Sequence, residues 1–300
     1  AADHEKTRQK RAADTQSREY LTIHQAREAR FRPEFDAPPP VPKIHGVKHF
    51  RNYPIATLAQ YIDWTFFFIA WQMKGKYPMI FDDPELGEEA RRLYDDAQEM
   101  LRQILAEEAI EARASISLYP AARTPDDTIE IYTDESRGEL AGKWHTLRQQ
   151  KQKEKLDYYL SLSDFVAEKG SGINDYVGGF CTNAGFGLED YVQRYKREGD
   201  DYKEILAKIL ADRLAEAFAE RLHEEIRTTW WGYAPEEDLS KADLFAVRYQ
   251  GIRPAPGYPP CPDHHDKEML FELLRAAELD MGLTESYMML PAAATSGFYF

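Results

Sequence analysis

The chain has very little cysteine, with only Cys181 and Cys261 among its 300 residues. Two cysteines cannot form the disulfide framework on which many small secreted proteins depend, so we expect a protein of the reducing cytoplasm. Long hydrophobic runs are lacking as well. The longest candidate, residues 64–71, is far shorter than the roughly 18 residues that a membrane-spanning helix needs.

An excess of positive charge is also lacking. The sequence holds 38 lysines and arginines against 52 aspartates and glutamates, which gives a formal net charge of −14. A nucleic-acid binder needs surplus basic residues to neutralise phosphates, and so does a protein that docks on an anionic membrane surface. We therefore expect neither a nucleic acid nor a membrane among the partners. The hydrophobic share of 43% is ordinary for a globular protein with a real core.

The chain begins with a strongly charged segment. Residues 1–31 are rich in helix-forming residues and poor in large apolar ones, so a helix formed there cannot bury a wide face. We interpret residues 1–35 as a linker helix and connecting segment that join an upstream module to a single domain over residues 36–300. Because the last residues, SGFYF, are aromatic without a polar tail, we expect the C-terminal end to be shortened.

The remaining pattern predicts an α+β fold. Residues 87–108 carry apolar side chains at helical spacing, and residues 202–227 form the longest predicted helix. Residues 112–121 and 127–134 are typical of two strands, joined by a hairpin or a short loop. The order of elements contains no βαβ repeat, which favours an antiparallel sheet over a doubly wound nucleotide-binding fold. Further predictions are a strand at 176–187, helices at 188–196 and 268–279, and a polar helix or linker at 146–155.

Two clusters could carry chemistry, and each has a plainer interpretation. The glycine-rich run at 178–187 precedes a predicted helix, where a phosphate could bind, but its spacing matches neither G-x-G-x-x-G nor the Walker pattern. Close backbone packing inside a sheet is the favoured interpretation. The second cluster holds metal-ligating residue types crowded into six positions, without a second group at ligand spacing. We expect no metal there. We expect Asp263 to cap a helix, with Asp266 in its first turn. The cluster consists of Cys261, Asp263, His264, His265 and Asp266.

The long predicted helix carries a line of polar residues. Asp212, Glu216 and His223 are spaced i, i+4 and i+11, which places all three on one helical face. Small alanines lie beside them, so this face could admit a partner. A solvated acidic face is the alternative interpretation.

The stretch RPAPGYPPCP at residues 253–262 is the strongest single feature. Its five prolines fix the backbone repeatedly and make a stiff loop, which loses little entropy when it binds a ligand. Arg253 can hold a carboxylate through two parallel hydrogen bonds, Gly257 allows a close backbone approach, and Tyr258 offers a flat face and a hydroxyl. The loop therefore indicates a small-ligand site, with a rigid connector as the alternative.

This loop also carries a family resemblance. GIRPAPGYPPCPDHHDK, residues 251–267, resembles the signature of the activation domain of cobalamin-dependent methionine synthase. Further blocks resemble the same family in the same order, so the resemblance covers roughly residues 15–300. These blocks are residues 61–83, 162–180, 200–224, 230–240 and 283–300.

The resemblance implies both a fold and a function. The fold is a C-shaped α+β domain with a twisted antiparallel sheet and flanking helices, preceded by a charged linker helix from a cobalamin-binding module. In this family of methyltransferases, a methyl group passes from methyltetrahydrofolate to homocysteine through cobalamin, in methionine biosynthesis. When the cofactor oxidises to cob(II)alamin, the activation domain supplies S-adenosylmethionine as methyl donor for reductive methylation. Flavodoxin or a flavodoxin-like reductase supplies the electron.

The implied cofactors are S-adenosylmethionine and the cobalamin that the partner module holds. Zinc belongs only to a homocysteine module that this chain does not contain. The isolated chain is not expected to turn over alone. The alternative is a regulatory or scaffold module that caps cobalamin and docks flavodoxin without productive ligand binding.

Carried over residue by residue, the resemblance places Arg253 on the methionyl carboxylate of S-adenosylmethionine. Ala255, Gly257 and Tyr258 belong to the same binding loop, with Tyr258 near the sulfonium and the corrin. Asp63, in the IDW block, is expected to bind the same ligand.

Three acidic residues are expected to contact the cobalamin module. Asp212 and Glu216 match the acidic positions of DRLAEAFAE, where a carboxylate can receive the histidine released from cobalt. Glu189 lies in another acidic contact region of the family. One departure is that the family's chain continues past SGFYF into a tyrosine-containing segment that completes the S-adenosylmethionine site, and this sequence lacks it.

Overall fold

The computed structural model describes residues 20–34, 37–152 and 157–300. Most of the predicted linker helix, residues 1–19, lies outside the described residues. The described part of that segment forms one short helix, α2 (Ile23–Glu28). Arg27 at its end holds α2 against the sheet, because its Nε lies 2.8 Å from Oδ2 of Asp127.

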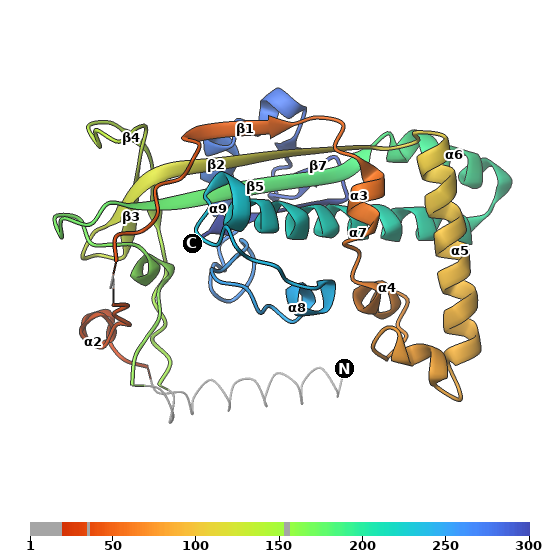
Figure 1. Ribbon diagram of the computed structural model, residues 1–300, viewed down its shortest axis with the longest axis horizontal. Coiled ribbons are helices and arrows are strands. Elements are labelled where there is room, and N and C mark those ends of the chain that lie inside the picture. The colour runs from red at the N-terminus through yellow and green to blue at the C-terminus, as the bar shows by residue number, and fades with distance from the viewer. Residues whose placement is uncertain (1–19, 35–36, 153–156) are drawn as a thin grey trace, which may run out of the picture.

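An antiparallel sheet runs through the molecule (Figure 1). Its two long strands, β2 (Glu111–Arg123) and β5 (Asp175–Phe186), pair along most of their length at the centre. The predicted α+β class with an antiparallel sheet is therefore confirmed. The other strands are β1 (Gly46–Phe50) beside β2, β3 (Thr128–Tyr132) and β4 (Leu140–His145) beyond it, β8 (Ala294–Tyr299) beside β5, and a separate ribbon of β6 (Gly282–Leu283) and β7 (Met289–Leu290).

The glycine-rich run forms β5, and its glycines are explained by close packing. A Cβ atom added at Gly185 would lie 1.9 Å from the carbonyl oxygen of Ala292. One added at Gly179 would lie 2.7 Å from Cδ1 of Leu270. Side chains at these positions would collide with neighbouring elements, so packing accounts for the run and phosphate binding is not needed.

The two faces of the sheet are covered by different helices. The long helix α7 (Asp201–Glu225) packs against β5 and β8, and Phe180 of β5 belongs to this larger core. Val177 and Cys181 face the other way, as the alternation of a strand requires, and pack with α9 (Asp266–Leu273). The remaining α-helices are α3 (Ile55–Ala59), α4 (Trp64–Ala70), α5 (Gly87–Ala106), α6 (Leu188–Glu198) and α8 (Lys241–Phe245). Short 3-10 helices are η1 (Met79–Asp82), η2 (Leu162–Phe165) and η4 (Ala276–Leu279), and η3 (Ile226–Trp230) is a short π-helix.

The predicted C shape is visible in Figure 1. Helices α4 and α5 descend from one end of the sheet, and α2 lies below the other end, where β3 and β4 are found. Helix α7 runs beneath the sheet between these arms, and α8 lies in the space that they enclose. Within the described ranges, none of the helices combines the length and the apolar character that a bilayer crossing demands.

Some local predictions are wrong. The single helix predicted over 268–279 is two elements, α9 and η4, because Arg275 between them adopts a left-handed φ of 47°. Asp263 does not cap α9, whose N-cap residue is His265. The Oδ1 atom of Asp263 instead accepts a hydrogen bond from the main-chain N–H of His265 at 2.9 Å, which closes a turn before the helix begins. Residues 146–152 form no helix, so the linker alternative holds there.

Candidate functional site

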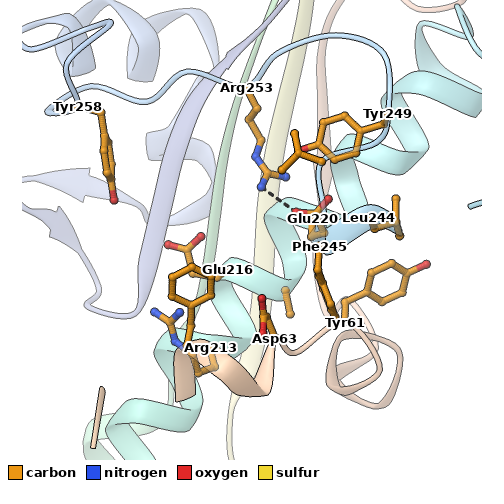
Figure 2. Close-up of a pocket in the computed structure, with 13 residues that line it drawn as sticks. Tyr61, Asp63, Arg213, Glu216, Glu220, Leu244, Phe245, Tyr249, Arg253 and Tyr258 are labelled. Atoms are coloured by element: carbon orange, nitrogen blue, oxygen red, sulfur yellow. Dashed lines mark hydrogen bonds and ion pairs between the residues drawn. The ribbon is translucent and has the colours of Figure 1, made fainter. Parts of the chain in front are cut away.

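A cavity of about 460 Å³ opens where α7 meets the proline-rich loop (Figure 2). Helix α7 lines one side, the start of α4 a second, and α8 with the chain that follows it a third. Apolar and aromatic side chains make up most of the wall, and charged groups converge on the space they enclose. The charged residues are Asp63, Arg213, Glu216, Glu220 and Arg253.

The structure brings most of the predicted ligand-binding residues to this place. Asp63, Arg253 and Tyr258 line the same cavity, although Asp63 is distant from the other two in the sequence. Ala255 lines an adjoining cavity of about 370 Å³, which shares Glu216, Arg253 and Tyr258 with the first. Gly257 lines neither cavity.

Arg253 is anchored to α7. Its Nη1 donates a hydrogen bond to the carbonyl oxygen of Ala219 at 2.8 Å, and its Nη2 donates to the carboxylate of Glu220 at 2.9 Å. The side chains of Arg253 and Glu220 are only 19% and 13% exposed. Figure 2 shows the guanidinium reaching down from the loop to this carboxylate. The loop arginine is therefore held in one orientation before any ligand arrives.

Asp63 is positioned by the start of a helix. It is the N-cap of α4, and its Oδ1 accepts the main-chain N–H of Thr65 at 2.9 Å. A short polar acceptor suits this position because the first N–H groups of a helix have no partner within it. Trp64, Phe67 and Phe68 bury the helix, so the wall that carries Asp63 is fixed by the core.

The proline-rich loop closes on itself around Gly257. The main-chain N–H of Cys261 donates to the carbonyl of Tyr258 at 2.9 Å, and that of Gly257 donates to the carbonyl of Cys261 at 2.7 Å. Gly257 has a φ of 100°, and an added Cβ would lie 2.4 Å from Cε1 of His264. The close approach that this glycine permits is thus made by His264. Tyr258 stays 65% exposed beside the cavity.

The acidic residues of α7 occupy different positions relative to the cavity. Glu216 lines both cavities, whereas Asp212, one turn earlier, lines neither. Desolvation by the surrounding protein raises the pKa of Asp212, and the charge of Arg213 lowers it in part. His223 shares their helical face by spacing but is completely buried, so the face passes from the cavity into the core.

Glu189 lies outside this region. It is an exposed residue of α6 and lines neither cavity. Its carboxylate lies 2.6 Å from Nζ of Lys196, and this bond holds the pKa of Glu189 below its usual value.

The side chains of the cluster around Cys261 form hydrogen bonds with one another. The Cys261 thiol donates to Asp266 at 3.2 Å, and burial raises the pKa of this thiol. Nδ1 of His265 lies 2.9 Å from Asp263. In the part of the chain that the structure describes, no group of three or more potential ligands is placed to hold a metal ion.

Sequence reasoning missed Glu220 and the wall that α8 contributes. Glu220 follows Glu216 by one helical turn, so extending the i, i+4 spacing would have found it. Leu244 and Phe245 carry no recognisable motif, and only the path of the chain brings them to the cavity.

A larger cavity of about 600 Å³ lies elsewhere, between the prolines at 38–40 and the aromatic rings of Trp231 and Phe300. Its charged lining is limited to Glu34 and Asp175, with no basic side chain among the described residues. Asp175 already accepts the N–H groups of Ala167 and Tyr176. Because charged groups of both signs line the cavity beside Arg253 and only acidic ones line this larger cavity, the cavity beside Arg253 is the better candidate of the two.

Comparison with known proteins identifies the family of this chain. Residues 54–300 match the family described as vitamin B12 dependent methionine synthase, activation domain. The fold is similar to the crystal structure of the MetH reactivation domain bound to AdoHcy, with a TM-score of 0.89 and 45% sequence identity. That match covers 94% of this chain and 86% of the other. The predicted resemblance is confirmed, and the chain belongs to the family of activation domains of vitamin B12-dependent methionine synthase, a methyltransferase.

Proposed function

We propose that this chain binds S-adenosylmethionine in the 460 Å³ cavity beside Arg253 and supplies its methyl group for the reductive methylation of cobalamin. The similar structure is bound to AdoHcy, which is what S-adenosylmethionine becomes when it loses that methyl group. The shared fold and the 45% identity support the transfer of this ligand class to the present chain.

The charge pattern of the cavity is the observation that carries the proposal. S-adenosylmethionine has one carboxylate, one ammonium and one sulfonium, and is therefore a net cation. The cavity offers Arg253 and Arg213 beside three carboxylates, those of Asp63, Glu216 and Glu220. A guanidinium can hold the ligand's carboxylate in two parallel hydrogen bonds, and the surplus of acidic groups favours the two positive charges.

Each residue of the site then has a proposed role. Arg253 holds the methionyl carboxylate, and Asp63 binds a polar group of the ligand from the opposite wall. Ala255 and Tyr258 border the adjoining cavity, where the exposed ring of Tyr258 can cover the sulfonium. Gly257 maintains the turn that presents Tyr258.

The partners follow from the family. If a partner module of the same polypeptide holds cobalamin beside the cavity, the methyl group of the sulfonium would pass to it together with one electron, and AdoHcy would remain as the second product. A flavodoxin or flavodoxin-like reductase supplies that electron, so this chain is not expected to turn over by itself. Glu189, Asp212 and Glu216 are the proposed contacts with the cobalamin module. All three are exposed, as such contacts require.

Domain limits and location complete the proposal. Residues 1–35 connect to the cobalamin module, and residues 36–300 form the activation domain. Both cysteines are free and buried, which suits a protein of the cytoplasm. Any zinc belongs to the homocysteine module.

One observation favours the scaffold alternative. Arg253 is already engaged by Glu220, so the ligand's carboxylate must share the guanidinium with Glu220 or displace it. If displacement costs too much, the chain would cap cobalamin without binding the methyl donor.

Calorimetric titration of the chain with S-adenosylmethionine separates these alternatives. The proposal expects saturable binding of one equivalent, and weaker binding of 5′-methylthioadenosine, which lacks the amino-acid group that Arg253 recognises. An absence of binding at millimolar ligand would contradict the proposal and favour the scaffold role.

A further inference from the structure

A buried histidine without a hydrogen-bonding partner lies beside the Arg253–Glu220 pair. His223 is 0% exposed. Its ring lies 5.2 Å from that of Tyr299 at an interplanar angle of 16°, and 4.8 Å from that of Tyr249 at 81°. Neither ring nitrogen has a hydrogen-bonding partner among the residues that the structure describes. Since burial of an unpaired polar group is costly, a plain core position would favour an apolar residue here.

His223 and Arg253 meet at the same turn of α7. Arg253 donates to Ala219 and to Glu220, which precede His223 by four and three residues and so lie on the same helical face. In an α-helix, the carbonyl of residue 219 is also the acceptor for the main-chain N–H of residue 223. The guanidinium and the imidazole therefore depend on one segment of main chain.

Burial and the charges around the ring of His223 both favour its neutral form. Burial is the main cause that lowers the pKa of His223 well below its ordinary value, and the positive charges of Arg253 and Arg227 lower it further. Arg227 lies in η3, directly after α7, and is paired with Glu237, whereas Glu220 is paired with Arg253. A neutral imidazole has one N–H donor and one acceptor nitrogen.

Other buried polar atoms in this region also lack a partner within the described part of the chain. They are the hydroxyl of Tyr299, Oε1 of Glu220 and Nη1 of Arg227. In folded proteins nearly all such atoms are paired, either with protein groups or with ordered water. These atoms include both donors and acceptors, which is the combination that a water-linked network around His223 requires.

We propose that His223 is a positioning residue for ligand binding. As a neutral donor and acceptor, it fixes the Arg253–Glu220 pair through this network, so that the guanidinium faces the carboxylate of the ligand in the cavity. This inference deepens the proposed function and rests on it.

Two substitutions and two ligands test the inference. His223→Phe keeps a flat ring but removes both nitrogens, whereas His223→Gln keeps a neutral donor and acceptor. Decarboxylated S-adenosylmethionine differs from S-adenosylmethionine only in the group that Arg253 is proposed to hold. We expect His223→Phe to weaken binding of S-adenosylmethionine by about threefold to tenfold, the size of one ordinary hydrogen bond. Its binding of the decarboxylated ligand should stay unchanged, and His223→Gln should recover most of the loss.

A matched control separates positioning from packing. Phe218→Leu changes a fully buried residue of the same helix that packs on Tyr53, with ring centroids 4.5 Å apart. It should lower the free energy of unfolding and affect both ligands alike. Equal loss of both ligands in His223→Phe or in His223→Gln would overturn the positioning role. Failure of the unchanged chain to bind S-adenosylmethionine would overturn the proposed function itself, and this inference with it.

The acid limb of the stability curve gives a second readout. Because the folded-state pKa of His223 lies below its ordinary value of 6.5, the unfolded chain binds one more proton as the pH falls past 6.5. The free energy of unfolding therefore decreases with falling pH in that range, and His223→Phe should remove this contribution. An unchanged slope in His223→Phe would show that the folded-state pKa of His223 is not lowered, which contradicts the neutral imidazole that the inference requires.

Discussion

Arg253 combines a proposed binding role with a structural one. It is a loop residue, yet its two terminal nitrogens bond to α7, and its carboxylate partner Glu220 is almost buried. Removal of one member of such a pair leaves the other charge without compensation. The loss of a ligand contact and the loss of stability must therefore be measured separately.

We expect Arg253→Ala to weaken S-adenosylmethionine binding by about 1.5–3 kcal/mol, the range for hydrogen bonds to charged groups. The same change should lower the free energy of unfolding, because Glu220 loses its partner. Titration calorimetry and urea unfolding measure the two effects. In Arg253→Ala with Glu220→Gln, stability should recover while binding stays weak. Unaltered binding by a folded Arg253→Ala chain would rule out the carboxylate role.

Helix α7 joins the core, the cavity and the exposed acidic surface in one element. Its apolar residues pack on β5 and β8, Glu216 and Glu220 line the cavity, and Asp212 lies on the surface beyond the cavity. The carboxylates of one helical face therefore differ in what they contact, and substitutions should separate them.

Asp212→Asn should raise the free energy of unfolding at pH 7 and leave S-adenosylmethionine affinity unchanged. The folded-state pKa of Asp212 is raised above 3.8, so its contribution to stability is present at low pH and is lost as the pH rises through the folded-state value. Asparagine does not ionise, so the Asp212→Asn chain does not lose this stability as the pH rises. Glu216→Gln, by contrast, should weaken binding of the cationic ligand, because Glu216 lines the cavity. Unfolding curves between pH 3 and pH 7, with titrations at pH 7, check both expectations. Equal effects of the two substitutions on affinity would contradict the expectation that Glu216 contacts the ligand and Asp212 does not.

At the scale of the whole molecule, an ion-pair cluster holds the end of the sheet that lies opposite α4. The side chains of Arg148 and Asp164 are both 0% exposed, with a guanidinium nitrogen 2.6 Å from the carboxylate. Arg148 also pairs with Asp127, and the carboxylate of Asp127 pairs in turn with Arg27 of α2. Figure 1 shows β3, β4 and α2 at this end, far from α4 and its wall of the cavity.

Asp164→Ala should therefore cost about 3–5 kcal/mol of stability, the usual penalty for breaking a buried ion pair. S-adenosylmethionine affinity of the folded fraction should remain the same. Glu99→Gln, which removes an exposed pair with Arg102, is the control and should leave stability almost unchanged, because water screens an exposed ion pair. Thermal unfolding with and without ligand tests this. A selective loss of affinity in Asp164→Ala would show that the two ends of the molecule are coupled.

Local patterns in the sequence were sufficient for the fold class and for several elements. The alternation in residues 128–132 predicts β3, and helical spacing predicts α5, because side-chain periodicity depends only on near neighbours. The prolines of residues 253–262 fix their own backbone angles, so a stiff loop could be expected without knowledge of the fold. The family blocks, read in order, identified the family.

Only the tertiary structure decided what these elements contact. Spacing placed His223 beside Asp212 and Glu216, but the chain around Tyr249 and the strand ending at Tyr299 bury it. Glu220 became a partner of Arg253, α8 became a wall of the cavity, and His264 filled the space beside Gly257. Each of these outcomes joins segments far apart in the chain. Burial and charge pairing arise from such long-range contacts, whereas a local pattern specifies only the conformation of its own segment.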